Sequence, residues 1–512
     1  MQVYLGLGAI ILFIICLIDL PFTKRYNQSL YGYFLRNGDL KLPGFVPAIL
    51  SANLSIGNFI IFIASWGYIF GWGGIFWFII NLLLNTVAYI VFIPAFKKYI
   101  ENKQNCGTIH EFLSSTFASS DKDKTFATKI RLVASATTIF GLLLAIVFEI
   151  HLASILLGPL LGINIPLIFS ILTVLICIYS GVGGFHTLIF TDIMQSIAMI
   201  IGTAAIIPVL TIFGSFDQVM KFYPPNLHAL NIGWPSILGI CIIGSGWFLV
   251  AMDQWQRTCA MRDSRRTKIG MIWYFASISL FAIVYALMGM YDHASLLPAL
   301  NSTLAAQHTG GNNPMVDFFL IAKIAPAIHP FLFALVGIAF LAAAMSTANT
   351  FLIVCGHSFV SDLLLTISNK KGIHSLTIEQ ERAYLAIARA TVTGMGIFVI
   401  IAWFIFSITG LLKDPLSFFF IAYSIQFALL APMVFSRLSQ RFQPSGQGVF
   451  NSIRVGVLIS VTSGVSFWIL SQHNIGPILG LKPFDWLSLT PVITLFAGTI
   501  VLMCSKRKGG LL

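Results

Sequence analysis

Two neighbouring hydroxyl residues near the middle of a long apolar stretch have types and spacing that could bind an ion. The stretch runs from Pro330 to His357 and contains Ser346 and Thr347. In a helix the carbonyl of residue i lies close to the side chains at i+3 and i+4, so both hydroxyls approach the Ala343 carbonyl. Three neutral oxygens, with no His or Cys, suit a small hard cation better than a transition metal. The alternative is that both hydroxyls bond only to the preceding turn of their own helix.

A second polar run interrupts another apolar stretch, residues 44–68. The run is Ser51–Asn58, with the sequence SANLSIGN. Ser, Asn and Gly are poor helix formers, so this run predicts an unwound segment in a membrane helix. Unwound backbone inside a membrane is tolerated where it lines a cavity or a bound ion. The alternative is a seam of small residues that packs against another helix.

A similar interruption, Gly244–Gly246, lies in the apolar stretch 234–255. The stretches 44–68 and 234–255 lie five apart in the series of spans given below. Interrupted helices at matching positions of two halves point to the binding site of a transporter built from an inverted repeat.

Three carboxylates lie well inside apolar stretches, and such residues are costly there and are functional candidates. They are Glu149, Asp192 and Asp253, out of 18 acidic residues in the chain. Asp192 either balances the charge of a bound cation or is a buried acid satisfied by Thr191 and Gln195.

Composition identifies the elements that must position these residues. The 512-residue chain is 57% hydrophobic and only 9% charged, whereas soluble domains carry about 25% charged residues. A polytopic all-α membrane protein is therefore expected, as one transporter domain over residues 1–512. The formal net charge of +12 lies in short loops, which argues against a nucleic-acid partner. The seven Cys show no metal-ligand spacing and no disulfide framework. The ten His are scattered, so no enzymatic site is expected.

Apolar stretches long enough to cross a bilayer, about 20 residues each, predict thirteen membrane helices. They lie at 3–20, 44–68, 72–95, 132–157, 163–181, 184–212, 234–255, 269–291, 329–357, 384–410, 415–436, 450–471 and 486–505. Two short helices are expected outside these spans, at Thr108–Ser115 and Pro314–Ala325.

Basic residues predict how the chain crosses the membrane. With the N-terminus outside, all but four of the 30 Lys and Arg fall in inside loops, and Arg257 is counted among those loop residues. The four outside are Lys221, Lys323, Lys413 and Lys482. This asymmetry predicts an integral plasma membrane protein, of a bacterial inner membrane, with an outside N-terminus and a cytoplasmic C-terminus.

Four motifs in order resemble the sodium:solute symporter family, which includes the sodium/glucose, proline, pantothenate, sialic acid and urea symporters. They are YSGVGG (Tyr179–Gly184), TDxxQ (Thr191–Gln195), DQWQR (Asp253–Arg257) and AAAMST (Ala342–Thr347). The resemblance covers residues 30–440. It implies a LeuT-like fold with two inverted five-helix repeats, 44–212 and 234–436. One extra N-terminal helix (3–20) and two C-terminal helices (450–505) complete the fold.

The resemblance also implies sodium ligands. The principal site would use the backbone carbonyls of Ser51, Leu54 and Ala343 and the hydroxyls of Ser346 and Thr347. These include the three oxygens identified from helical spacing alone. A second sodium, or a charge-balancing group, would involve Asp192, Asn349 and Thr350, although Asn349 departs from the family's serine pattern.

For the solute, the resemblance implies contacts beside the two broken helices. The implied residues are Asn58, Trp247, Asp253, Gln254, Tyr423 and Gln426. The family's DQxxxQR pattern is two residues shorter here, so the register of the contacts on 234–255 is open. The sialic acid branch has an Arg in the helix that corresponds to 132–157, and this span has no Arg or Lys. A neutral, zwitterionic or cationic solute is therefore expected, an amino acid first and a sugar or urea-like compound second.

The expected function is sodium-coupled symport of a small organic solute by alternating access, within the lipid bilayer and with no obligate protein partner. Two alternatives stay open. One is a proton-coupled symporter of the same fold, although the hydroxyl pair argues against it because a proton carrier needs no oxygen cage. The other is a transporter-like sensor that binds the solute and passes on a signal.

Overall fold

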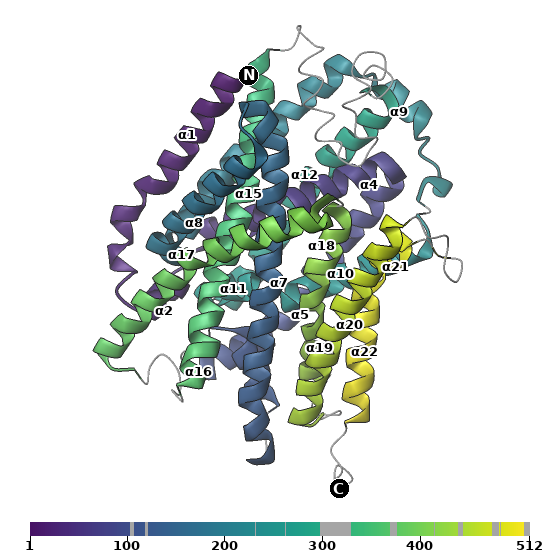
Figure 1. The fold of residues 1–512 in the computed structure, drawn as a ribbon. Coiled ribbons are helices and arrows are strands. Elements are labelled where there is room, and N and C mark those ends of the chain that lie inside the picture. Colours follow the sequence, from purple (N-terminus) through teal and green to yellow (C-terminus); the bar gives the residue numbers. More distant parts are fainter. Residues whose placement is uncertain are drawn as a thin grey trace.

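The chain forms a bundle of helices in a computed structural model (Figure 1). The structure describes residues 1–102, 107–117, 121–230, 232–261, 263–296, 329–368, 376–413, 415–438, 444–473, 481 and 483–505. No β-strand occurs within these ranges. The all-α prediction is therefore confirmed for the described part of the chain.

A helix lies over each stretch that the sequence marks as a span. The first half contains α1 (Gln2–Ile18), α3 (Leu42–Asn53), α4 (Phe62–Phe70), α5 (Trp72–Asn102), α7 (Asp121–Leu161) and α8 (Ile165–Phe213). The second half contains α10 (Trp234–Val250), α11 (Met252–Ala260), α12 (Ser264–Tyr291), α15 (Pro330–Ser358), α17 (Ile378–Thr409), α18 (Pro415–Ser424) and α19 (Leu430–Leu438). The chain continues with α20 (Gly446–Gln472) and α22 (Thr490–Cys504). Short helices are α2 (Leu30–Leu35), α6 (Ile109–Thr116), α9 (Phe216–Phe222), α16 (Leu365–Ile367) and α21 (Pro483–Ser488).

The number of membrane crossings stays a prediction. By length and apolar composition, the described residues contain nine helices able to span a membrane, or ten when the bent pair α10 and α11 is one span. Three shorter apolar helices, Leu42–Asn53, Phe59–Phe70 and Thr490–Cys504, cover further predicted spans. The helix predicted at Thr108–Ser115 is confirmed as α6, whereas the one predicted at Pro314–Ala325 lies outside the described residues.

A glycine divides α8 into two segments at the boundary between two predicted spans. α8 has 49 residues, and Gly184 inside it has a φ of +62°. This left-handed conformation suits glycine, and a Cβ there would lie 2.6 Å from the ring of Tyr33. The break releases carbonyls at the end of the first segment. Asn27 donates to the Val182 carbonyl at 2.9 Å, and the Tyr33 hydroxyl donates to the Gly181 carbonyl at 2.8 Å.

The interruption predicted at Gly244–Gly246 is wrong in position. α10 continues through these residues, and the break lies at Ala251, where α10 and α11 meet at a bend of 46°. The glycines serve close packing instead: a Cβ on Gly244 would lie 2.2 Å from Asn81 Oδ1, and one on Gly246 would lie 2.5 Å from Leu430. Small residues allow helices in membranes to approach closely without breaking the helix that contains them.

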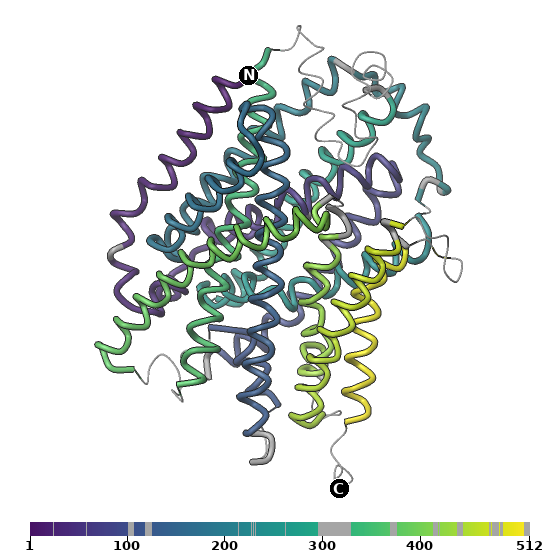
Figure 2. The backbone as a smooth tube through the Cα atoms, viewed as in Figure 1, coloured from purple at the N-terminus to yellow at the C-terminus, as the bar shows by residue number. Residues whose placement is uncertain are grey.

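The hydroxyl-bearing helix α15 occupies the interior of the bundle. It packs against α1, α3, α7, α8 and α17, and every residue from Ala339 to Ser358 is buried. Figure 2 shows α1 (purple) along one side of the molecule and α20 and α22 (yellow) along the other. α1 exposes a row of large apolar side chains that includes Leu7, Ile10 and Ile14, as expected for a helix that faces lipid.

Candidate functional site

A break in the helix that follows Lys41 forms one side of the site. α3 ends at Asn53, Leu54 has a ψ of 51°, and the backbone continues as a π-helical segment, Ile56–Ile61. The unwinding predicted for this run is therefore confirmed. Backbone groups at such a break lack their usual helical partners, and the Gly57 amide instead donates to Glu149 Oε2 on α7 at 3.2 Å.

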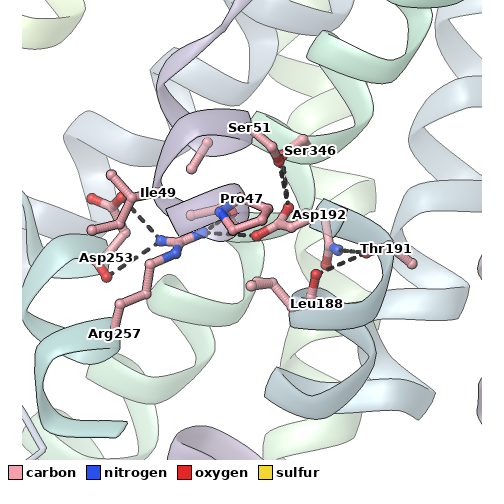
Figure 3. A network of polar contacts seen from close by, with 12 residues as sticks. Pro47, Ile49, Ser51, Leu188, Thr191, Asp192, Asp253, Arg257 and Ser346 are labelled. Atoms are coloured by element: carbon pink, nitrogen blue, oxygen red, sulfur yellow. Dashed lines mark hydrogen bonds and ion pairs between the residues drawn. The ribbon is translucent and has the colours of Figure 1, made fainter. Parts of the chain in front are cut away.

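Side chains from three helices meet on one carboxylate beside this break. Ser51 of α3 donates to Asp192 Oδ1 at 2.9 Å, and Ser346 of α15 donates to the same oxygen at 2.7 Å. The two serine hydroxyls also contact each other. All three side chains are fully buried. Figure 3 shows both hydroxyls directed at Asp192, which is on α8. The cluster therefore joins α3, α8 and α15 through oxygen atoms alone.

The neighbouring hydroxyl extends this cluster along the break. Thr347 donates to the Ala52 carbonyl, one residue from Ser51, at 3.4 Å. Leu54 is the first residue of the unwound segment, and Ala343 lies one turn before Ser346 and Thr347 in the same unbroken helix. The structure thus brings together, around one point, the helix segments that carry all five residues predicted for the principal sodium site.

The donor set of this cluster fits a hard cation. Hydroxyl, carbonyl and carboxylate oxygens are the ligands that such ions take from proteins. Softer metals prefer imidazole and thiolate ligands, and in the described ranges no group of three or more His, Cys, Asp or Glu is placed to hold a metal ion. The fit rests on the oxygens of Ser51, Ser346 and Thr347 beside one carboxylate, Asp192.

An arginine completes the polar network on the other side of Asp192. Arg257 Nη2 donates to Asp192 Oδ2 at 3.0 Å and to the Thr350 hydroxyl at 2.9 Å, and Nη1 donates to Asp253 Oδ2 at 3.2 Å. The arginine side chain is fully buried. In Figure 3 its guanidinium lies between the two carboxylates. The interpretation of Arg257 as a cytoplasmic loop residue is therefore wrong, because α11 directs it into the bundle.

The residues predicted for a second ion divide between two sets of partners. Asp192 and Thr350 meet on the Arg257 guanidinium, as described. Asn349 instead bonds to α8: its Oδ1 accepts from Ser180 at 2.7 Å, and its Nδ2 donates to Thr191 at 3.3 Å. Asn349 is thus separated from the other two residues, and both interpretations of this trio stay predictions.

The alternative account of Asp192, as an acid satisfied by its own helix, does not match the structure. Thr191 donates to the Leu188 carbonyl at 3.0 Å, and the Gln195 amide is directed at Cys16, with Nε2 3.9 Å from Sγ. The strong partners of Asp192 come from other helices.

A cavity of about 100 Å³ lies next to the α3 break. A single water needs about 10–15 Å³ of such space, so the cavity is large enough for a small organic molecule. Asn53, Trp247, Asp253 and Tyr423 are among the lining residues, and the rings of Trp247 and Tyr423 are 5.0 Å apart. Three of the predicted solute contacts, Trp247, Asp253 and Tyr423, therefore line this cavity.

The other predicted solute contacts are placed differently. Gln254 donates to Asp253 Oδ2 at 2.6 Å and is buried behind it. Gln426 packs against α7, with its Cγ 3.0 Å from the position of a Cβ on Gly141. Neither glutamine is among the cavity-lining residues. The side chain of Asn58 lies outside the described part of the structure.

The sequence pattern of the sodium:solute symporter family matches residues 33–456. The chain therefore belongs to the sodium:solute symporter family.

Two relatives are similar to this chain at low sequence identity. It is 26% identical to the high-affinity proline transporter PutP of Bacillus subtilis (strain 168), over 56% of this chain and 59% of that protein. It is 24% identical to the sodium/sialic acid symporter SiaT of Proteus mirabilis (strain HI4320), over 76% of each chain. The match thus spans less than two thirds of the proline transporter.

A solved structure shares the fold over nearly the whole length. It is the substrate-bound outward-open state of a Na⁺-coupled sialic acid symporter, with a TM-score of 0.74, 18% identity and coverage of 99% of this chain and 98% of that one. At this level of identity the similarity establishes the fold. The LeuT-like prediction is thereby confirmed.

Proposed function

We propose that this protein is a secondary active transporter that couples sodium entry to the uptake of a small organic solute. One observation carries the proposal: Ser346 and Thr347 of α15 face Ser51 and Ala52 at the broken end of α3, with Asp192 beside them. A sodium ion bound among these oxygens would link three helices that otherwise contact through uncharged groups and one carboxylate.

Sodium binding at this point would favour one arrangement of the bundle over others. A ligand shifts a conformational equilibrium only by its differential affinity for the states, and a site shared by α3, α8 and α15 exists only when these helices are aligned. Each positive charge that moves inward through 100 mV supplies about 2.3 kcal/mol. That energy is equivalent to a concentration ratio of about 50-fold for the coupled solute.

The positions of the two breaks support the proposed repeats, 44–212 and 234–436. The first repeat begins with the pair α3 and α4, broken after Asn53, and the second begins with α10 and α11, broken at Ala251. Broken helices at corresponding positions are typical of inverted-repeat transporters, whose sites lie between them. The polar network of Asp192, Arg257 and Asp253 lies between these two breaks.

The cavity wall favours a solute without net negative charge. Asp253 is the charged residue among the described residues that line it, beside the amides of Asn53, Asn81 and Asn85. Aromatic rings including Trp247 and Tyr423 form much of the remaining surface, and such rings favour apolar groups and cations. An amino acid is the first choice, as in the proline relative, and a sugar or urea-like compound is the second.

We further infer that the chain is oriented with its N-terminus outside and its C-terminus in the cytoplasm of a bacterial inner membrane. The distribution of Lys and Arg along the sequence supports this orientation.

Thermal stability of the purified protein tests the proposal. Melting would be measured in sodium and in potassium, at equal ionic strength, with a panel of amino acids, sugars and urea. Binding to the folded state raises the melting temperature. A sodium-specific rise that one solute increases further is the expected result. If a solute raises the melting temperature equally in sodium and in potassium, the proton-coupled or sensor alternatives are favoured.

A further inference from the structure

The arginine beside Asp192 occupies the position where another cation would be stabilised. Oδ1 of Asp192 accepts the hydroxyls of Ser51 and Ser346, while Oδ2 faces Arg257 Nη2 at 3.0 Å. The same Nη2 also donates to the Thr350 hydroxyl at 2.9 Å. One carboxylate therefore has one oxygen that faces two hydroxyls and an opposite oxygen already bonded to a fixed cation.

Asn349, the other residue predicted to contribute an oxygen ligand near Asp192, directs its side-chain oxygen elsewhere. The Asn349 side-chain oxygen accepts from Ser180 at 2.7 Å, within the packing between α15 and α8. Asn349 follows Ser346 by three residues and Thr350 follows Thr347 by three, so both lie about one turn further along the same helix. Both are bonded to protein groups and not to each other.

Charge balance gives the number of ions that this network accommodates. Two buried carboxylates, Asp192 and Asp253, contact one buried guanidinium, Arg257. When all three groups are ionised, the network has one net negative charge. Uncompensated charge in a membrane interior is costly, so one monovalent cation neutralises the network and a second would leave an unpaired positive charge.

We propose that Arg257 serves as a built-in cation beside Asp192 and Thr350, so that the protein binds one sodium ion per chain and has no second sodium site there. The inference rests on the proposed function, because it assumes a sodium ion on the Ser51–Ser346 side of Asp192.

Asp253 keeps the guanidinium in place. It precedes Arg257 by four residues on α11, and both its Oδ2 and its backbone carbonyl accept from Nη1, at 3.2 and 3.3 Å. Residues four apart lie on the same helix face. Asp253 also lines the solute cavity. Arg257 therefore links the carboxylate beside the proposed ion to the wall of the proposed solute site, and its role is to position and neutralise Asp192.

The test counts sodium ions bound to the purified full-length protein. Equilibrium binding of radioactive sodium, with choline keeping the ionic strength constant, gives the number bound per chain at saturation without any solute. One ion per chain is expected for the unaltered protein. Two ions per chain would overturn the inference and leave the proposed function standing. No sodium-specific binding would overturn both.

Two variants test whether Arg257 sets that number. Arg257→Gln leaves a net charge of minus two and opens the space beside Thr350, so two sodium ions per chain are expected. Adding Asp253→Asn restores a net charge of minus one, and one ion per chain is expected again. If the single variant is not recovered as a monodisperse protein, the double variant still decides, since two ions per chain there would contradict the charge-balance argument.

A third variant keeps the network's charge and removes only the hydroxyl. Thr350→Val should leave one sodium per chain and change the half-saturating sodium concentration less than about threefold, because the hydroxyl bonds to Arg257 and not to the ion. Loss of all sodium binding in this variant would contradict the assignment of Thr350.

Discussion

Asp192 is the residue at the centre of the proposed ion site, and its two oxygens have different partners. Two serine hydroxyls from α3 and α15 bond to Oδ1, and the Arg257 guanidinium bonds to Oδ2. The carboxylate is buried completely, so these contacts replace the water that it would otherwise have. A change at any of these partners should therefore appear first in the response to sodium.

Removal of the α15 hydroxyls should weaken sodium binding. Ser346→Ala together with Thr347→Ala removes two predicted oxygen ligands and leaves the helix intact. Loss of interactions with a charged group costs about 1.5–3 kcal/mol each, so the sodium concentration for half-maximal uptake should rise at least about tenfold. The measurement is solute uptake against sodium concentration in proteoliposomes.

A buried serine elsewhere provides the control for that pair. Ser154→Ala on α7 removes a hydroxyl that donates only to the Ile150 carbonyl of its own helix, at 2.6 Å, and should leave the sodium dependence unchanged. An unaltered sodium dependence in the Ser346/Thr347 variant would show that the ion binds elsewhere.

At the scale of elements, the breaks in α3 and between α10 and α11 position the site. The sequence predicted the correct position for only the first of these breaks. The run Ser51–Asn58 is polar as well as small, its helix propensity is poor, and α3 ends within it at Asn53. Gly244–Gly246 is also poor in propensity. However, the close approach of α5 and α19 stabilises the helix through these residues, and the break lies at Ala251.

This packing role of Gly244 leads to a stability prediction. In Gly244→Ala the new Cβ would lie 2.6 Å from the Asn81 carbonyl oxygen, so α5 must move. Overpacking of this kind costs about 1–3 kcal/mol, and the melting temperature should fall. Gly394→Ala on α17 is the matched control, because a Cβ there meets nothing within 4 Å.

Equal melting temperatures for the two glycine variants would contradict the packing explanation. The sodium-dependent increase in melting temperature should persist in both, since neither glycine contacts the Asp192 network.

Arg257 shows why part of the site could not be predicted from local sequence. Ser51, Ser346, Thr347 and Asp192 stand out because they are polar residues within apolar spans. Arg257 follows the end of such a span, where basic residues commonly mark a cytoplasmic loop. Its partner Asp192 is 65 positions away, and only the bend at Ala251 directs α11 back into the bundle. A carboxylate four residues before the arginine was the one local signal.

At the scale of the whole molecule, the prediction to test is the orientation of the bundle in the membrane. The apolar stretches predicted the helices well because each must satisfy its own backbone in lipid. The orientation rests on the basic loops, and a free cysteine can report it. Among the described cysteines, Cys504 at the end of α22 is exposed and Cys241 is half-buried, whereas Cys16, Cys177, Cys259 and Cys355 are buried.

Thiol labelling from one side of the membrane tests this orientation. A membrane-impermeant maleimide should label Cys504 in inside-out vesicles and leave it unlabelled in right-side-out vesicles. The Cys504→Ser variant identifies the share of the signal that comes from Cys504, because that share alone should disappear with the change. Labelling of Cys504 in right-side-out vesicles would place the C-terminus outside.

Solute uptake driven by a sodium gradient tests the central claim of sodium-coupled symport most directly. Purified protein in proteoliposomes would be given the radioactive solute identified by thermal stability, with sodium either outside only or equal on both sides. The account predicts transient accumulation above the external concentration with the inward gradient, and simple equilibration without it. Identical uptake under the two conditions would contradict sodium-coupled transport.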